Sequence, residues 1–398
     1  MSLNFIHNIL SWIRKDDRFL IVEINDNNFR LIPARANFRD RRIRILKALK
    51  SKDGETLVGR IKKVKNLSKY KIILSLDSPI ASTIYSSVSL VRENAELKID
   101  EADLDNILSQ AIWRFFDRQR KVVSNKMNVD DIDVVLSDVK IWDIKLDRHR
   151  VINPLGFSPR EVSVKLSQTL FKRPIFSVIE SIFPGDSLIH MTESHASVGR
   201  ILGEVIKEKS FLVANILKRN TNLVLNDGER IATIDSFDWG EEIFLEEVGK
   251  RLSVTDDIAK YVSHVYNKKQ ASPLFLKKVG GILEEEYYTL INGLQNVISR
   301  LEVQNLYLNA PYELPEFILR LHFKNKNGKN VRIHGISEKF IGENFGFVVK
   351  FDSIGESFEL QSGATLILDS YLSPQNTLAN NIAKRRARWL MNQNITKQ

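Results

Sequence analysis

Short runs of apolar residues, each bounded by polar or turn-forming residues, recur along the chain. Four of them lie at 19–24, 71–76, 210–216 and 303–308. Apolar runs of this length favour strands that are buried on both faces of a sheet. Turn residues at 26–28 and 226–228 separate strand patterns and predict β-hairpins. Further strands are expected at 42–50, 82–91, 132–138, 141–146 and 161–166.

Other segments repeat apolar residues at the spacing of an amphipathic helix. The segment 100–121 has the clearest pattern, and Asp100 is placed to cap its first turn. Helices are also predicted over 177–183, 241–252, 255–266, 283–301 and 377–391, and mixed strand and loop from 317 to 370. Hairpin groups separated by helices occur twice, in 19–91 and 210–308, which indicates two related α/β lobes.

Both ends of the chain carry an amphipathic helical pattern with a tryptophan and basic residues. Such helices are typical of membrane surfaces or partner binding, and the alternative is that each helix docks on its own domain or lies solvated. The residues expected to contact lipid are Phe5, Ile9, Trp12, Arg14, Lys15, Arg385, Arg386, Arg388 and Trp389.

Composition narrows the class of protein. The chain has 398 residues, 43% of them hydrophobic, and no cysteine, which excludes disulfides, thiolate metal sites and a cysteine nucleophile. It has no apolar stretch of about 18 residues and no signal-peptide pattern at its start, so we expect neither a transmembrane helix nor secretion. The expected location is cytoplasmic.

The charge is strongly basic and uneven. The formal net charge is +10, and residues 30–71 hold fifteen Lys and Arg against three acids. A basic surface attracts anions, whether lipid, nucleic acid or an acidic partner. Few aromatic residues interleave with these cations, so nucleic acid is not the expected partner, although a basic nucleic-acid-binding protein stays an alternative.

Side chains that could carry chemistry are scattered. His190 and His195 flank Glu193, but their spacing does not match a helical zinc pair and no third ligand is evident. We therefore predict surface or loop histidines, no metal site and no catalytic residue. The acidic run at 284–286 is interpreted as complementing a helix dipole.

Three stretches resemble a known family. They are residues 99–104, the Asn-Pro-x-Gly turn within 151–158, and the segments 237–243 and 256–261. The chain resembles the actin-like superfamily, and within it the family of the bacterial division protein FtsA and its relative PilM of type IV pilus assembly. The resemblance implies a two-lobed actin-like (ribonuclease H-like) α/β fold with an inserted α+β subdomain. It implies the boundaries 1–16 for an N-terminal helix, 17–98 for the first lobe, 99–184 for the insert, 185–372 for the second lobe and 373–398 for a C-terminal helix.

The nucleotide loops of that family are degenerate in this chain. Actin-like ATPases bind phosphate on glycine-rich turns, where backbone N–H groups can approach the oxygens. The matching positions here lack those glycines. They are Glu23, Asn25, Asp26, Asn215, Lys218, Arg219, Asn309 and Ala310. We therefore expect no nucleotide cofactor and a pseudo-ATPase, with a live actin-like ATPase as an alternative.

The resemblance implies the work of a scaffold. We expect a non-catalytic adaptor at the inner face of a membrane, with an FtsA-like role in cell division or, alternatively, a PilM-like role in pilus or secretion machinery. The expected partners are an anionic membrane surface, division or pilus proteins, and possible further copies of the chain.

Overall fold

The computed structural model describes residues 16–25, 29–50, 56–183, 188–206, 210–310, 314–352, 363–373 and 377–393. The helix predicted at the N-terminus lies outside the described residues, as does Asp26. None of the helices in the described part of the chain has the length and apolar character needed to cross a membrane.

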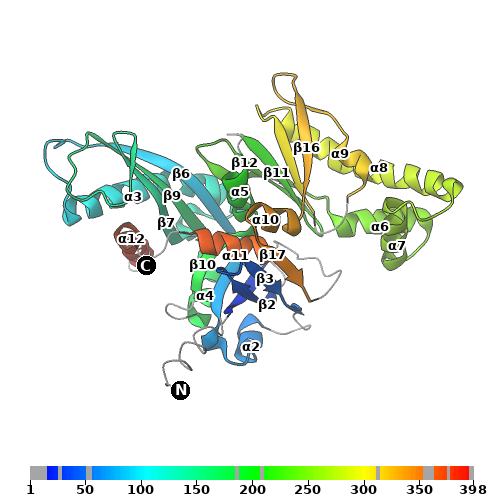
Figure 1. The fold of residues 1–398 in the computed structure, drawn as a ribbon, viewed down its shortest axis with the longest axis horizontal. Coiled ribbons are helices and arrows are strands. Elements are labelled where there is room, and N and C mark those ends of the chain that lie inside the picture. Colours follow the sequence, from blue (N-terminus) through cyan, green and yellow to red (C-terminus); the bar gives the residue numbers. More distant parts are fainter. Residues whose placement is uncertain are drawn as a thin grey trace, which may run out of the picture.

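The first of two mixed β-sheets has the strand order β10-β5-β1-β2-β3-β17, and β4 pairs with β2 (Figure 1). The strands β1, β2 and β3 form an antiparallel meander, and β5 and β10 extend the sheet parallel to β1. The strands are β1 (Asp17–Ile24), β2 (Phe29–Asn37), β3 (Arg42–Ile45), β4 (Leu49–Lys50), β5 (Lys71–Leu76), β10 (Leu188–Glu193) and β17 (Val348–Phe351).

The second sheet has the order β15-β16-β14-β11-β12-β13-β6-β9-β7-β8. Its meander runs through β11, β12 and β13, and β14 and β16 extend it in parallel. The strands are β6 (Ala81–Val91), β7 (Val134–Leu146), β8 (His149–Val151), β9 (Glu161–Lys172), β11 (Phe211–Ile216), β12 (Thr221–Asn226), β13 (Ile231–Phe237), β14 (Asn305–Asn309), β15 (Phe323–Lys324) and β16 (Asn330–Ile336).

Helices cover both sheets, and α5, α10 and α11 lie between them (Figure 1). The helices are α2 (Leu57–Lys62), α3 (Glu101–Met127), α4 (Arg173–Ile182), α5 (Ser194–Val205), α6 (Glu241–Leu252), α7 (Asp256–Asn267), α8 (Pro273–Ile298), α9 (Glu316–Leu319), α10 (Glu338–Asn344), α11 (Gly363–Leu372) and α12 (Leu378–Gln393), with short 3-10 turns η1 (Leu67–Lys69) and η2 (Asp131–Asp133).

The same unit occurs once in each sheet. The order β3-β2-β1-β5-β10 in the first sheet matches β13-β12-β11-β14-β16 in the second, and the strand directions agree. The elements from β6 to α4 are inserted between β5 and β10 of the first unit, and in Figure 1 those from β6 to β9 form an arm to the left. The doubling indicated by the sequence is therefore present.

Strand pairing joins segments that the predicted boundaries separate. β6 falls in the segment predicted as the first lobe, yet it pairs along its whole length with β9 of the insert. β10 falls in the segment predicted as the second lobe, yet it pairs with β5 of the first sheet. Pairing between distant segments leaves no local mark in a sequence.

Most predicted elements are confirmed. β1 and β2 form the expected hairpin, β12 and β13 pair across the turn at 226–228, and α3 begins at the predicted cap. The side chain of Asp100 accepts a hydrogen bond from the backbone N–H of Asp103 at 2.7 Å, which satisfies one of the free donors of the first turn.

Three predictions were wrong. The two strands expected at 132–138 and 141–146 are one strand, β7, whose register shifts at two bulges hide its continuity. The helix expected at 283–301 begins ten residues earlier, at Pro273. The region 317–370 is not only strand and loop, because it contains α9, α10 and the buried helix α11.

One apolar core joins the two lobes. It combines Ile21 of β1, Val198 of α5, Val213 of β11 and Leu366 of α11, all fully or almost fully buried. Separate cores lie under the inserted arm and under the helices α6 to α9. Because the central core contains residues of both sheets, separating the lobes would expose apolar surface to water.

Candidate functional site between the two lobes

The parallel strands of both sheets end near the region where the lobes meet. In open α/β sheets, ligands bind beyond the carboxyl ends of such strands. Here these ends are followed by Asn25, Asp77 and Ser194 in the first lobe and by Leu217 and Ala310 in the second. The degenerate loop positions found in the sequence belong to this region.

Glu23, at the first of these loops, is buried within the sheet. It is 1% exposed, and it lies opposite Arg30 in the β1–β2 ladder and opposite Ser75 in the β1–β5 ladder. Asn25 follows the end of β1 and is half-buried. The carboxylate of Glu23, just before this loop, is therefore enclosed by neighbouring strands of the sheet.

The second loop is the turn between β11 and β12, and α6 closes over it. The backbone N–H groups of Glu241 and Glu242 donate to the carbonyls of Leu217 at 2.9 Å and Lys218 at 2.6 Å. A Cβ atom on Gly240 would lie 2.5 Å from the Lys218 carbonyl, so only glycine allows this approach. The helix N-terminus, which could attract an anion, is directed at the turn itself.

Acidic side chains of α6 also pair with the cations of this turn. Lys218 Nζ lies 3.3 Å from Glu242, and the Arg219 guanidinium lies 3.5 Å from Glu242 and 3.3 Å from Glu246. These groups are partly exposed, so each pair contributes little to stability. The pairs nevertheless neutralise positive charge that could otherwise attract a phosphate.

The third loop position is also bound within the protein. The amide of Asn309 on β14 donates to Asn215 Oδ1 on β11 at 2.9 Å, and Asn215 is fully buried. Ala310 follows at the end of β14 and is half-buried. At this position the two strands are therefore bridged by their own side chains.

Beyond these loops, a fully buried carboxylate, Glu193, lies where three parts of the molecule meet. Ser78 donates to Glu193 Oε1, Thr233 donates to the same oxygen at 2.5 Å, and Lys126 Nζ lies 3.2 Å away from it. The backbone N–H of Thr83 donates to Oε2 at 3.0 Å. Ser78 follows β5, Thr83 is on β6, Lys126 is on α3 and Thr233 is on β13, and we call these five residues the Glu193 junction.

The junction holds Glu193 in its ionised form. Burial by itself raises the pKa of this carboxyl group, but Lys126 and His195 oppose burial. Together with the hydrogen bonds from Ser78 and Thr233, they lower the pKa below its ordinary value. A fixed negative charge therefore lies between the lobes.

His195 makes a second contact between the lobes. It is fully buried near the start of α5, and its Nε2 lies 3.3 Å from Asp77 Oδ1 and 2.8 Å from the amide nitrogen of Asn222. Asp77 follows β5 of the first sheet, whereas Asn222 belongs to β12 of the second. Polar side chains thus connect the two sheets at two neighbouring points.

A buried chain of charged groups continues from the arm to the central helices. Lys140 of β7 contacts His190 Nδ1, and His190 Nε2 lies 2.8 Å from Asp369 of α11. Asp369 in turn accepts from Arg200 of α5, whose guanidinium lies 4.5 Å from the centre of the Trp142 ring. We call Lys140, His190, Asp369 and Arg200 the charged chain.

Burial and the neighbouring charges set the titration of this chain. Burial lowers the pKa of His190, and the nearby Lys140 lowers it further. Burial opposes ionisation of Asp369, but Arg200 and His190 outweigh it and hold the pKa of Asp369 well below its usual range. His190 is thus neutral between a cation and an anion, donating through Nε2 and accepting through Nδ1.

The prediction of surface or loop histidines was wrong for His190 and His195. Both are buried, one in the strand β10 and one in the helix α5, and a ring nitrogen of each lies within hydrogen-bond distance of a carboxylate. In the described part of the chain, no group of three His, Asp or Glu side chains could hold a metal ion.

The basic residues predicted at the C-terminus lie on α12, which packs on the inserted arm. Its apolar face, including Ile382 and Leu390, is buried in the core of the arm. Arg385 and Arg386 both pair with Asp105 of α3. Arg388 is exposed and Trp389 is 49% exposed. Phe5, Ile9, Trp12, Arg14 and Lys15 lie outside the described residues, so contact of either terminus with lipid stays a prediction.

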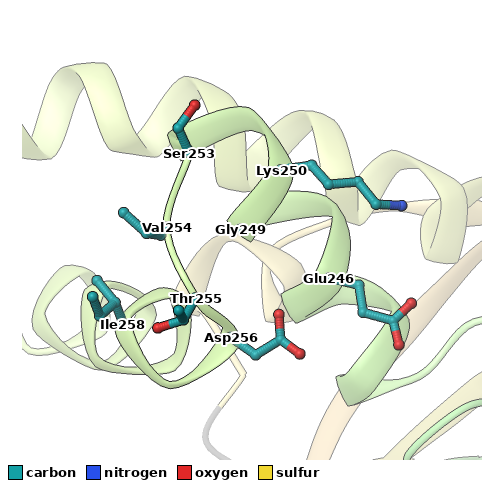
Figure 2. A pocket seen from close by; sticks show the side chains of 8 residues that line it. All are labelled: Glu246, Gly249, Lys250, Ser253, Val254, Thr255, Asp256 and Ile258. Atoms are coloured by element: carbon teal, nitrogen blue, oxygen red, sulfur yellow. The ribbon is translucent and has the colours of Figure 1, made fainter.

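Figure 2 shows a hollow of about 550 Å³ where α6 turns into α7. Its lining mixes apolar Val254 and Ile258 with the charged groups of Lys250 and Asp256. Glu246 lines it too, and the carboxylate of Glu246 pairs with Arg219 of the β11–β12 turn. It belongs to the second lobe alone and does not reach the Glu193 junction.

The repeated strand order, the helices between the lobes and the insert before β10 define a two-lobed actin-like α/β protein, so the predicted fold class is confirmed. No protein-family model matches the chain, and a comparison with curated proteins finds no relative.

Comparison with solved structures finds distant likenesses. A PilM-PilN type IV pilus biogenesis complex is 14% identical, with a TM-score of 0.46 over 93% of this chain and 98% of that one. A Bacteroides thetaiotaomicron protein with an actin-like ATPase fold and unknown function is 10% identical, with a TM-score of 0.32 over 89% and 95%. The psk41 ParM protein is 8% identical, with a TM-score of 0.30 over 82% and 97%. At these scores the likenesses add nothing to the argument from topology.

Proposed function

We propose that this chain is a non-catalytic scaffold that acts as an adaptor at the cytoplasmic face of a membrane. The observation that supports it most is the Glu193 junction, where side chains of both lobes and of the insert meet at a buried carboxylate. In this proposal the protein's own contacts hold the lobes together in the region where a nucleotide would bind.

The surroundings of the junction disfavour a phosphate ligand. Glu193 already pairs with Lys126 and accepts from Ser78 and Thr233, so the cation and the donors of the junction are engaged within the protein. The first backbone N–H groups of α6 already donate to Leu217 and Lys218, and the cations of that turn pair with glutamates. A nucleotide would have to displace these contacts before it could be bound.

The shared core supports the same proposal. The apolar residues of α5 and α11 pack with residues of both sheets in one core, so buried apolar contacts join the two lobes. A rigid body of this kind suits a scaffold, because it presents surfaces in a fixed relation to one another. We assign the work to protein contacts at the membrane, with a division role like that of FtsA.

Thermal unfolding with Mg-ATP tests the non-catalytic part of the proposal. A ligand at 100 times its Kd stabilises a protein by about 2.7 kcal/mol, which would raise the Tm by several degrees. We expect a change of less than about 1 °C and no phosphate release above the buffer blank. Protection by Mg-ATP, lost on its replacement by Mg-sulfate, would revive the alternative of an active actin-like ATPase.

A binding experiment separates the two candidate roles. The resemblance in the sequence extends to PilM, so a pilus scaffold is the second candidate. Immobilised full-length chain is presented with a tubulin-like division polymer and, separately, with the cytoplasmic segment of a pilus inner-membrane protein. We expect retention of the division polymer, and retention of the pilus segment alone would transfer the proposal to the second role.

A further inference from the structure

The outer end of the second lobe carries two exposed apolar side chains. Figure 1 places α7 and the start of α8 at the right-hand end of the molecule, away from both sheets. Leu274 and Phe275, in the first turn of α8, are 67% and 40% exposed. We call residues 268–278, which follow α7 and include the first residues of α8, the α7–α8 tip.

The tip holds these side chains in a defined geometry. The Ser272 side chain caps α8 by accepting from the backbone N–H of Phe275 at 3.3 Å, and Pro273 follows at the first helical position. On the other side, the N–H of Gln270 donates to the carbonyl of Val265 at 3.0 Å. The apolar pair is thus presented by a capped helix.

Lysines lie on both sides of the apolar pair in the sequence. The segment 267–281 contains no acidic residue, and its lysines are Lys268, Lys269, Lys277 and Lys278. All four are exposed. Lys269 Nζ is 3.8 Å from Glu316, whereas Lys277 and Lys278 make no ion pair within the part of the chain that the structure describes. The tip therefore combines exposed apolar side chains with exposed basic ones and holds no acid.

Another exposed apolar surface, at the end of the inserted arm, lacks this charge pattern. Ile152 and Phe157 are 100% and 52% exposed. Two of its arginines are paired with acids, and one of them, Arg150, lies 2.8 Å from an oxygen of Asp143. Arg92 is likewise paired with Asp103 at 2.6 Å. Acids such as Asp143 and Asp147 stand among the basic residues of the arm, whereas the α7–α8 tip contains no acid.

We propose that the α7–α8 tip docks on the surface of a bilayer that contains anionic lipid. Leu274 and Phe275 enter the headgroup region, and the lysines contact lipid phosphates while their aliphatic stems cover the apolar pair. This inference rests on the membrane location in the proposed function and names the surface that makes the contact. Charge complementarity selects the partner, because the tip joins basic groups with apolar ones and offers no acid.

Vesicle binding by the full-length chain tests the inference. Vesicles of phosphatidylcholine, with or without phosphatidylserine, are sedimented with the wild-type protein, with Leu274→Ser/Phe275→Ser and with Lys277→Gln/Lys278→Gln. Each lysine near an anionic surface accounts for about a fivefold change in affinity, so the double lysine variant should bind roughly 25-fold more weakly. The apolar variant should lose at least as much. Ile152→Ser/Phe157→Ser is the matched control and should bind like wild type.

A local probe separates insertion from a loss of folding. Because the chain has no cysteine, Leu274→Cys can be labelled with an environment-sensitive dye at that position alone. Its emission should shift to the blue with anionic vesicles, and a dye at Ile152→Cys should not respond.

The outcomes distinguish the inference from the proposed function. If wild type binds anionic vesicles but both tip variants bind equally well and the dye at residue 274 is silent, the membrane location stands and the tip is not the contact. If Ile152→Ser/Phe157→Ser loses binding while both tip variants keep it, the end of the inserted arm and not the tip is the surface that contacts the membrane. If the wild-type protein binds no vesicle at low salt, the inference is wrong, and so is the membrane location in the proposed function.

Discussion

Replacing Glu193 by glutamine is the sharpest test of how the lobes are held together. Glutamine keeps the size of the side chain and one carbonyl oxygen, but it removes the charge. Its amide group would then face either the backbone N–H of Thr83 or the donors Ser78 and Thr233. Toward Thr83 the amide would meet another donor, and toward Ser78 and Thr233 it would make those hydroxyls accept instead of donate. In either orientation Lys126 would lose its anion.

The expected cost follows from these contacts. Breaking a buried charged pair costs about 3–5 kcal/mol, because the remaining charge stays in a region of low dielectric. Lys126 is 25% exposed, so water can partly solvate its ammonium group once the partner is gone. We therefore expect a loss near the lower end, about 3 kcal/mol.

Urea unfolding followed by circular dichroism measures this loss. Glu229→Gln, at an exposed position in the β12–β13 turn, is the matched control and should change stability by less than about 0.5 kcal/mol. Lys126→Met and the double variant complete a cycle that isolates the pair. If Glu193→Gln unfolds at the same urea concentration as wild type, the junction does not hold the lobes together and the reasoning behind the scaffold fails.

Two further predictions address the charged chain and the closed turn. The pKa of His190 is lowered in the folded protein, so below pH 6.5, the ordinary pKa of a histidine, the unfolded chain binds one proton more than the folded chain. The free energy of unfolding should therefore fall from pH 7 to pH 5 by up to about 1.4 kcal/mol per pH unit. Denaturant titrations at several pH values measure this slope, and His190→Asn should flatten it. Gly240→Ala should cost about 1–3 kcal/mol in the same assay, because its Cβ would strike the Lys218 carbonyl, whereas Gly281→Ala, with open space around it, should be neutral or stabilising. A flat wild-type pH profile, or equal effects of the two glycine variants, would contradict these accounts.

The elements that the sequence predicted well are those with a local signal. The apolar run of β1 and the cap of α3 depend on residues within a few positions of one another. The helix α11 has no such signal, because its residues from 363 to 370 are buried on all sides and show no polar face. A short apolar stretch of this kind cannot be assigned to helix or strand by periodicity alone.

Only part of the candidate site could be predicted from the sequence, and the reason is again the distance between the residues along the chain. The degenerate loops could be found because missing glycines are a local feature. The Glu193 junction could not, since Ser78 is 115 residues and Thr83 is 110 residues from Glu193 in the chain. The same holds for the charged chain, in which Arg200 and Asp369 are 169 residues apart. The sequence placed His190 and His195 near Glu193 but gave no sign of their burial.

The basic residues differ in whether an acidic side chain pairs with them, and this difference bears on the proposed membrane contact. On α12, Arg385 and Arg386 are both paired with Asp105, and at the β11–β12 turn Arg219 is paired with two glutamates. In these two places positive charge stabilises contacts within the protein instead of attracting a partner. Lys277 and Lys278 differ, because no acid of the surrounding segment compensates them and the apolar pair stands beside them. Lys384 and Arg388 of α12 are likewise exposed and have no ion pair among the described residues. An anionic surface that approaches the molecule at low salt would therefore be attracted to both places, and the variants of the α7–α8 tip measure the share of the tip alone.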